Sequence, residues 1–236
     1  MDLKIKDLQK QIKQHQNPAR AKSNLWFFKT GKGEYGEGDK FLGLIMAQQR
    51  ALAKKFVDLQ LADLIPLVKS PWHEERMIGL LILTYKFPKA KVKEKKQIFD
   101  FYIKYRQAVN NWDLVDLTAP RVVGEYLVDK DRSILMKYAK SKDLWEKRIA
   151  ILATFSFIKR GDFQDSLKIA KILLLDKHDL IHKAIGWMLR EIGKKDQAVE
   201  EAFLREYYKK MPRTMLRYSI EKFAEPLRVK YLKGKI

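Results

Sequence analysis

The sequence contains no cysteine among its 236 residues. Disulfide bonds, thiolate metal sites and thiol nucleophiles are therefore excluded. Long apolar runs are also missing, because the longest, such as Ile149 to Phe155, are far shorter than the roughly 18 residues that cross a membrane. The Lys-rich start has no apolar run of signal-peptide length. We therefore expect a soluble, cytoplasmic protein that does not contact membranes.

Motifs for phosphate binding and hydrolysis are missing too. The Gly-rich stretch from Gly31 to Gly38 lacks a Gly-Lys-Ser or Gly-Lys-Thr ending, which favours a connection between helices over a phosphate cradle. No serine lies in a Gly-x-Ser-x-Gly elbow. His178 and His182 have the spacing of metal ligands, but no Glu follows His178 and no other His is near, so a surface helix is favoured over a zinc site. We expect no metal and no cofactor.

Positive charge is what the chain has in excess. It carries 49 Lys and Arg against 29 Asp and Glu, a formal net charge of +20. Acidic partners for such a chain are nucleic acid, an anionic membrane or an acidic protein, and nucleic acid is the commonest of these. A generally basic surface without a specific partner is the alternative.

Apolar residues recur with helical spacing along nearly the whole chain, and no segment shows the sustained alternation of a half-buried strand. The first predicted helix has Leu3, Ile5, Leu8 and Ile12 on one face and ends before Asn17-Pro18. Many short connections indicate an all-α fold. The predicted helices that follow cover about Ala19 to Phe28, Leu42 to Val57, Leu61 to Lys69, Pro71 to Phe87, Val92 to Val109, Trp112 to Leu127, Asp131 to Ala139, Leu144 to Lys159, Phe163 to Leu175, Asp179 to Ile192, Gln197 to Met211 and Thr214 to Lys233.

The chain also repeats. A basic residue followed by a tightly packed apolar run recurs at Arg76, Arg148 and Lys183, and Trp112 falls into the same register, so the spacings are 36, 36 and 35 residues. This period is typical of two-helix solenoid repeats. The sequence therefore predicts a right-handed solenoid of antiparallel helix pairs, of the HEAT type, as a single domain over residues 1–236. The small residues Gly79, Ala150 and Gly186 fit close helix packing within each repeat.

Equivalent positions of successive repeats stack along one surface of a solenoid, and residues four apart share a helix face. We therefore predict a concave basic groove that contains two indoles and one carboxylate. Each residue has a plainer interpretation: the tryptophans as core, Asp116 as a solvated carboxylate, and Asp113 as a favourable charge at a helix N-terminus. The predicted groove residues are Trp112, Asp116, Arg148, Lys183, Trp187 and Arg190.

The sequence resembles the AlkD-like DNA alkylation repair glycosylases along most of its length. The resemblance is carried by segments that occur in the family's order: residues 35–43 (YGEGDKFLG), 111–116 (NWDLVD), 144–150 (LWEKRIA), 183–191 (KAIGWMLRE) and 211–223 (MPRTMLRYSIEKF). The family is built from HEAT-like repeats and removes cationic N-alkylated purines, such as 3-methyladenine and 7-methylguanine, from duplex DNA.

The resemblance implies a role for each groove residue. Asp116 matches the catalytic aspartate, and Trp112 and Trp187 match two tryptophans that line the cleft beside the deoxyribose of the lesion. Arg148 matches an arginine that faces the DNA, Lys183 and Arg190 would contact the backbone, and Phe27 lies where the family places another cleft aromatic. The resemblance further implies a monomer, and a lesion that is not rotated into a deep pocket.

Two features leave alternatives open. After Phe41-Leu42-Gly43 the family continues with a Pro-containing turn, whereas this chain reads Leu44 to Arg50 without proline, which puts the DNA contacts of the first repeats in doubt. A HEAT-repeat protein that binds DNA without chemistry, or a protein-binding scaffold, would share the fold. The preferred lesion, and any tolerance of bulky adducts, is not encoded in these motifs.

Overall fold

The computed structural model describes residues 3–236, so Met1 and Asp2 of the Lys-rich start lie outside the described part. Within that part every regular element is a helix, and the one β-type pairing is an isolated bridge between Lys40 and Trp72. The prediction of an all-α fold is confirmed.

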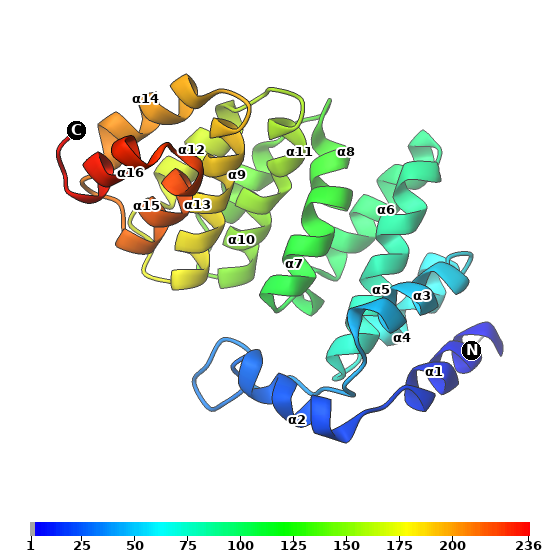
Figure 1. Ribbon diagram of the computed structural model, residues 1–236. Helices are drawn as coiled ribbons and strands as arrows, with labels where there is room; N and C mark the ends of the chain where they lie inside the picture. The colour runs from blue at the N-terminus through cyan, green and yellow to red at the C-terminus, as the bar shows by residue number, and fades with distance from the viewer. Residues whose placement is uncertain (1–2) are drawn as a thin grey trace. The chain divides into compact units, whose positions relative to one another are not determined.

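The chain folds into two compact units, one that runs up to Val122 and one that comprises Val123–Ile236 (Figure 1). A single domain, the right-handed solenoid and its basic groove stay predictions. Unit 1 contains α1 (Leu3–Gln14), α2 (Pro18–Phe27), α3 (Met46–Lys55), α4 (Ile65–Val68), α5 (His73–Lys86), α6 (Val92–Lys104) and α7 (Trp112–Ala119). Unit 2 contains α8 (Glu125–Leu127), α9 (Ser133–Ala139), α10 (Leu144–Ala153), α11 (Phe155–Ile158), α12 (Gln164–Ile172), α13 (Asp179–Gly193), α14 (Gln197–Tyr207), α15 (Arg213–Ser219) and α16 (Glu225–Leu232).

Helix α5 forms the core of unit 1, and every residue from His73 to Thr84 is buried. The helices α3, α4 and α7 pack against it. Gly79 allows α4 to come close, because a Cβ at this position would lie only 3.2 Å from side-chain atoms of Leu67 and Val68. The predicted role of Gly79 in close packing is confirmed.

Helix α13 has the corresponding place in unit 2, where α10, α14 and α15 pack against it. A Cβ on Gly186 would lie 2.5 Å from the Met215 carbonyl oxygen and from Tyr218 Cβ, so only glycine permits this approach of α13 to α15. Ala150, the third predicted small residue, is completely buried in α10. The helices that carry the repeat register are thus neighbours within each unit, α5 beside α7 and α10 beside α13.

The predicted helix from Leu42 to Val57 begins later than expected, at Met46. The Glu74 carboxylate of α5 accepts hydrogen bonds from the backbone N–H groups of Leu42, at 2.9 Å, and Gly43, at 2.8 Å. Gly43 has φ +87°, which a helix does not allow, and a Cβ here would lie 2.1 Å from the Asn17 carbonyl oxygen. Leu42 and Gly43, just before the segment without proline, are therefore held out of the helix by a residue of another helix.

Three other predicted helices are interrupted. Pro120 has no N–H to donate, and the helix that begins at Trp112 widens into a π-helical segment, Pro120–Gly124, before α8. The predicted Leu144 to Lys159 helix breaks at Thr154, whose hydroxyl donates to the Ile151 carbonyl at 2.6 Å. The predicted Thr214 to Lys233 helix breaks between α15 and α16, where Pro226 lies in the first turn of α16.

Candidate functional site

Trp112 and Asp116 lie one turn apart on α7, and both are half-buried. The helix begins at Trp112 because the Asn111 side chain caps it, with Oδ1 accepting from the Trp112 N–H at 2.9 Å. Asn111 is fully buried, so the start of α7 is fixed in unit 1. Residues four apart share one helix face, which puts the indole beside the carboxylate.

The Trp112 indole belongs to a cluster of aromatic rings from three other segments of unit 1. Phe28 stacks on it with ring centroids 5.5 Å apart, and Phe27 meets it edge-on at 5.8 Å. Phe28 also stacks on Phe41, at 5.0 Å, and lies 5.0 Å from the His73 imidazole. Such pairs contribute about 0.5 to 1.5 kcal/mol each beyond area burial. The structure thus brings together Phe27 and Trp112, two of the predicted site residues.

His73 lies between two carboxylates, with Nδ1 2.9 Å from Asp39 and Nε2 2.9 Å from Asp113. All three residues are buried. Both ring nitrogens face acceptors, an arrangement that suits the doubly protonated imidazolium. Burial by itself lowers the pKa of His73, but Asp113 and Asp39 outweigh it and raise this pKa to about 9. His73 is therefore a buried cation that ties the first turn of α7 to α5.

The two carboxylates that flank this imidazolium, Asp39 and Asp113, have further partners nearby. Burial raises the pKa of Asp39, but the hydrogen bond from His73 and the charge of Arg76 outweigh it, and the pKa is lowered. Asp113 Oδ1 accepts from the Leu114 N–H at 2.9 Å, while its other oxygen, Oδ2, accepts a hydrogen bond from His73 Nε2 at 2.9 Å. The role predicted for Asp113, at the helix N-terminus, is thus combined with a long-range ion pair.

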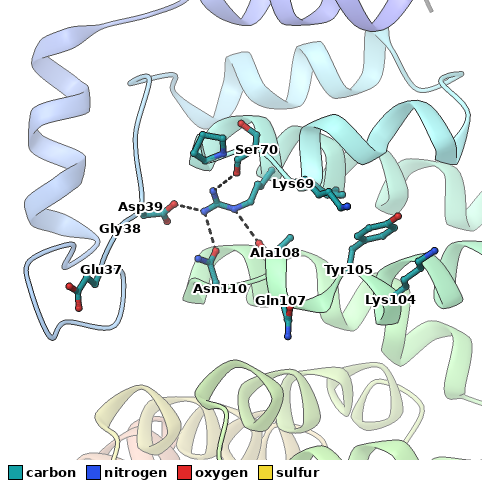
Figure 2. Close-up of a pocket in the computed structure, with 13 residues that line it drawn as sticks. Glu37, Gly38, Asp39, Lys69, Ser70, Lys104, Tyr105, Gln107, Ala108 and Asn110 are labelled. Atoms are coloured by element: carbon teal, nitrogen blue, oxygen red, sulfur yellow. Dashed lines mark hydrogen bonds and ion pairs between the residues drawn. The ribbon is translucent and has the colours of Figure 1, made fainter. Parts of the chain in front are cut away.

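Arg76, the first basic residue of the repeat register, is surrounded by acceptors. Figure 2 labels the residues that supply them, which are Asp39, Ser70, Ala108 and Asn110. Its guanidinium donates to the carbonyls of Ser70, at 3.0 Å, and Ala108, at 3.2 Å, to Asn110 Oδ1 at 3.0 Å, and to Asp39. These bonds hold the segment before α7 against α5. A cavity of about 810 Å³ runs along this cluster, and its rim includes Glu37, Lys69, Lys104, Tyr105 and Gln107.

Trp187, in unit 2, lies half-buried on α13. Its Nε1 donates to Glu191 at 3.1 Å, one turn further along the same helix, and its ring centroid is 6.1 Å from that of Phe155. The hydrogen bond and the ring contact together hold the indole in place. The indole N–H is therefore satisfied.

The basic residues of α13 are engaged in ion pairs with carboxylates. Lys183 lies 2.7 Å from Asp179 across one helical turn, with both side chains largely exposed. Arg190 pairs with Glu221, which follows α15. An exposed pair such as Lys183–Asp179 stabilises a fold by about 0 to 1 kcal/mol, so an anion can compete for Lys183. The Arg190 side chain is only 16% exposed.

Arg148 is placed differently from the other predicted cations. Its side chain is buried, and the guanidinium donates to the Leu180 carbonyl in the first turn of α13. It therefore joins α10 to α13. A DNA contact of Arg148 stays a prediction.

The predicted site residues divide between the two units. Unit 1 holds Phe27, Trp112 and Asp116, and unit 2 holds Arg148, Lys183, Trp187 and Arg190. The common groove for all of them stays a prediction. Of the residues that the structure describes, no group of three or more His, Cys, Asp or Glu could hold a metal ion. No helix in residues 3–236 is long and apolar enough to cross a membrane.

Sequence reasoning overlooked the residues that hold α7 in place: Asp39, Phe28, Phe41, His73 and Arg76. One signal was available. His73 is one of only four histidines, and it opens a helix in which almost every following residue is buried, together with two glutamates and an arginine. Charged residues are rarely fully buried unless they are paired, so this cluster indicated partners elsewhere in the chain.

Comparisons with known proteins give one family match and one similar fold. The sequence model of the DNA alkylation repair enzyme family matches residues 8–223. The fold is similar to that of a predicted DNA alkylation repair enzyme from Enterococcus faecalis, with a TM-score of 0.70 at 16% sequence identity, over 89% of this chain and 98% of that chain. No curated protein sequence matches.

Proposed function

Because the chain belongs to the DNA alkylation repair enzyme family, we propose that it is a monofunctional DNA glycosylase. It hydrolyses the N-glycosidic bond of cationic N-alkylated purines, of the 3-methyladenine and 7-methylguanine type, in duplex DNA. The observation that carries this proposal is the half-buried Asp116 one turn from an indole that Phe27 and Phe28 hold in place.

The proposed reaction needs no strong general acid. An N-alkylated purine already carries a positive charge, so it leaves without protonation. As the bond to C1′ stretches, the sugar becomes an oxocarbenium-like cation, and a fixed carboxylate stabilises that developing charge. Asp116 supplies the carboxylate and orients the water that attacks C1′.

The aromatic residues are proposed to stabilise positive charge as well. An indole face attracts a cation by about 0.5 to 2 kcal/mol. Trp112 is proposed to hold the cationic lesion and the sugar, and Trp187 to act with it from α13. Phe27, which is about half exposed and touches Trp112, extends the same apolar surface.

Binding to DNA rests on the net charge of +20. Lys183 and Arg190 are the proposed phosphate contacts on α13, where phosphates would replace Asp179 and Glu221 as their partners. Arg148, on α10, is the third proposed contact. Because it is buried, Arg148 is the least accessible of the three.

A base-release assay tests the proposal. Purified protein is expected to release free 7-methylguanine and 3-methyladenine from methylated duplex DNA. Asp116→Asn is expected to lower release about 10²-fold to 10³-fold, the general size of losing one charge-stabilising group, while DNA affinity is retained. Asp100→Asn is the matched control, since Asp100 is a carboxylate on α6 of the same unit that pairs with Lys96 at the surface.

The products separate this activity from its alternatives. A monofunctional enzyme leaves an intact strand with an abasic site, and borohydride traps no protein on the DNA because no lysine forms a Schiff base. If the protein binds alkylated duplex DNA but releases no base, it is a DNA-binding protein without this chemistry and the proposal fails.

A further inference from the structure

Helix α2 ends in an apolar surface that the fold does not cover. Leu25, Trp26 and Phe27 are exposed by 42%, 76% and 53%, and no residue of α2 is buried. Large apolar side chains that are exposed one after another mark a contact surface more often than isolated ones do. Phe27 is accounted for by its contact with Trp112, but the more exposed Trp26 is not.

The surroundings of Trp26 are basic. Lys29 Nζ lies 5.1 Å from the centroid of its ring. The helix also carries Arg20 and Lys22 and contains no acidic residue. An aromatic ring among cations, with no nearby anion on its own helix, matches the combination by which proteins bind exposed nucleobases: the ring stacks on a base and the cations neutralise the phosphates beside it.

The position of the helix relates this surface to the proposed site. Phe27, the residue after Trp26, lies 5.8 Å from Trp112 by ring centroids. Successive Cα atoms are about 3.8 Å apart, so a base on Trp26 would belong to the same short DNA segment as a base at Trp112. In a fully paired duplex every base face is covered by its neighbours, and a free face arises only where pairing is interrupted.

We propose that Trp26 stacks on an unpaired nucleobase of the DNA strand bound at Trp112, while Lys22 and Lys29 neutralise the adjacent phosphates. The proposal rests on DNA binding as part of the proposed function, but not on catalysis. The proposed occupant of this surface is a base in DNA. A second copy of this chain is the alternative occupant that the experiment distinguishes.

Binding to undamaged DNA tests the proposal separately from base release. Two duplexes are compared by fluorescence anisotropy, one fully paired and one with a single unpaired 2-aminopurine. Trp26→Ala is expected to weaken binding to the second duplex by about 5-fold to 100-fold, the effect of losing one stacked base, and to leave affinity for the first unchanged. Quenching of 2-aminopurine by the wild-type protein is expected to be lost in Trp26→Ala and kept in Trp26→Phe.

Val92→Ala is the matched control, because Val92 is 79% exposed on α6 and its truncation removes apolar surface away from α2. Equal losses on both duplexes for Trp26→Ala would overturn the stacking role. Unchanged DNA binding together with a wild-type dimer that Trp26→Ala dissociates, measured by sedimentation velocity, would assign the surface to a second copy and overturn the proposal. A protein that shows the Trp26 effect but releases no base would retain this inference and lose the glycosylase.

Discussion

The charged state of His73 gives a prediction that can be worked from the structure. Replacement by Gln removes the imidazolium and leaves Asp39 and Asp113 buried with a neutral amide between them. Breaking a buried ion pair on one side generally costs about 3 to 5 kcal/mol. We expect His73→Gln to lower the free energy of unfolding by about this amount at pH 6.

The stability that is lost in His73→Gln should become smaller as the pH rises. The pKa of His73 is raised from 6.5 to about 9 in the folded protein, which corresponds to about 3 kcal/mol at about 1.4 kcal/mol for each pH unit. For a raised pKa the stabilisation is complete below pH 6.5 and is lost as the pH rises through 9. The difference between wild type and His73→Gln should therefore fall by about 3 kcal/mol between pH 6 and pH 9.5.

Urea unfolding of both proteins at a series of pH values measures this difference. Titrations that are common to both, including that of Glu200, cancel when the two curves are subtracted. A difference that is the same at pH 6 and pH 9.5 would show that His73 carries no proton-linked stabilisation and would refute the reasoning. A parallel loss of base release with rising pH would indicate that α7 is held in place by the same charge.

Three further predictions concern stability. Gly43→Ala should lower the free energy of unfolding by about 3 kcal/mol or more, because a Cβ would lie 2.1 Å from the Asn17 carbonyl oxygen. Gly161 has a similar positive φ but lies in open space, so Gly161→Ala is the control and should cost about 1 kcal/mol by urea unfolding. Burial raises the pKa of Glu200 to about 9, so its folded form keeps a proton that the unfolded chain has lost above pH 4.5, and stability falls as the pH rises towards 9. Glu200→Gln should therefore be more stable than wild type at pH 8 by at least about 1 kcal/mol in thermal unfolding, an advantage that disappears below pH 4.5. Glu74→Gln should lose about 1 to 3 kcal/mol in urea unfolding, because Leu42 and Gly43 donate to different carboxylate oxygens and one of their N–H groups would then face the amide NH2, which is itself a donor. An unchanged midpoint would contradict this role for the carboxylate.

Most helices could be predicted from the sequence because their ends depend on nearby residues. Asn17 caps α2, with Oδ1 accepting from Arg20 N at 3.0 Å, and Pro18 occupies its first turn, as the Asn17-Pro18 stop indicated. Among the helices of the repeat register, α5 packs beside α7 and α10 beside α13. The glycine positions within that register could be interpreted because close packing needs the absence of a Cβ wherever two helices approach.

Two of the errors share one physical cause. The start of α3 was placed too early because Glu74, about 30 residues further along the chain, takes the N–H groups that a helix would have used. The role of Asp113 was understood only in part, because its second oxygen binds a histidine 40 residues before it. In both cases a buried charge found its partner across the fold, and spacing along the chain carries no information about that partner.

The sequence by itself determined the helical class, the repeat of about 36 residues, the family and the pairing of Trp112 with Asp116 on one helix face. The helical class, the repeat spacing and the pairing of Trp112 with Asp116 follow from periodicity and from residues within a turn of one another. The family follows from the motif segments that the chain shares with it. Only the tertiary structure decided that Phe27 and Phe28 pack on Trp112, that His73 is a buried cation, and that Arg76 and Arg148 hold helices together. The reason is that burial makes an unpaired charge costly, so the fold must supply partners from wherever the chain passes.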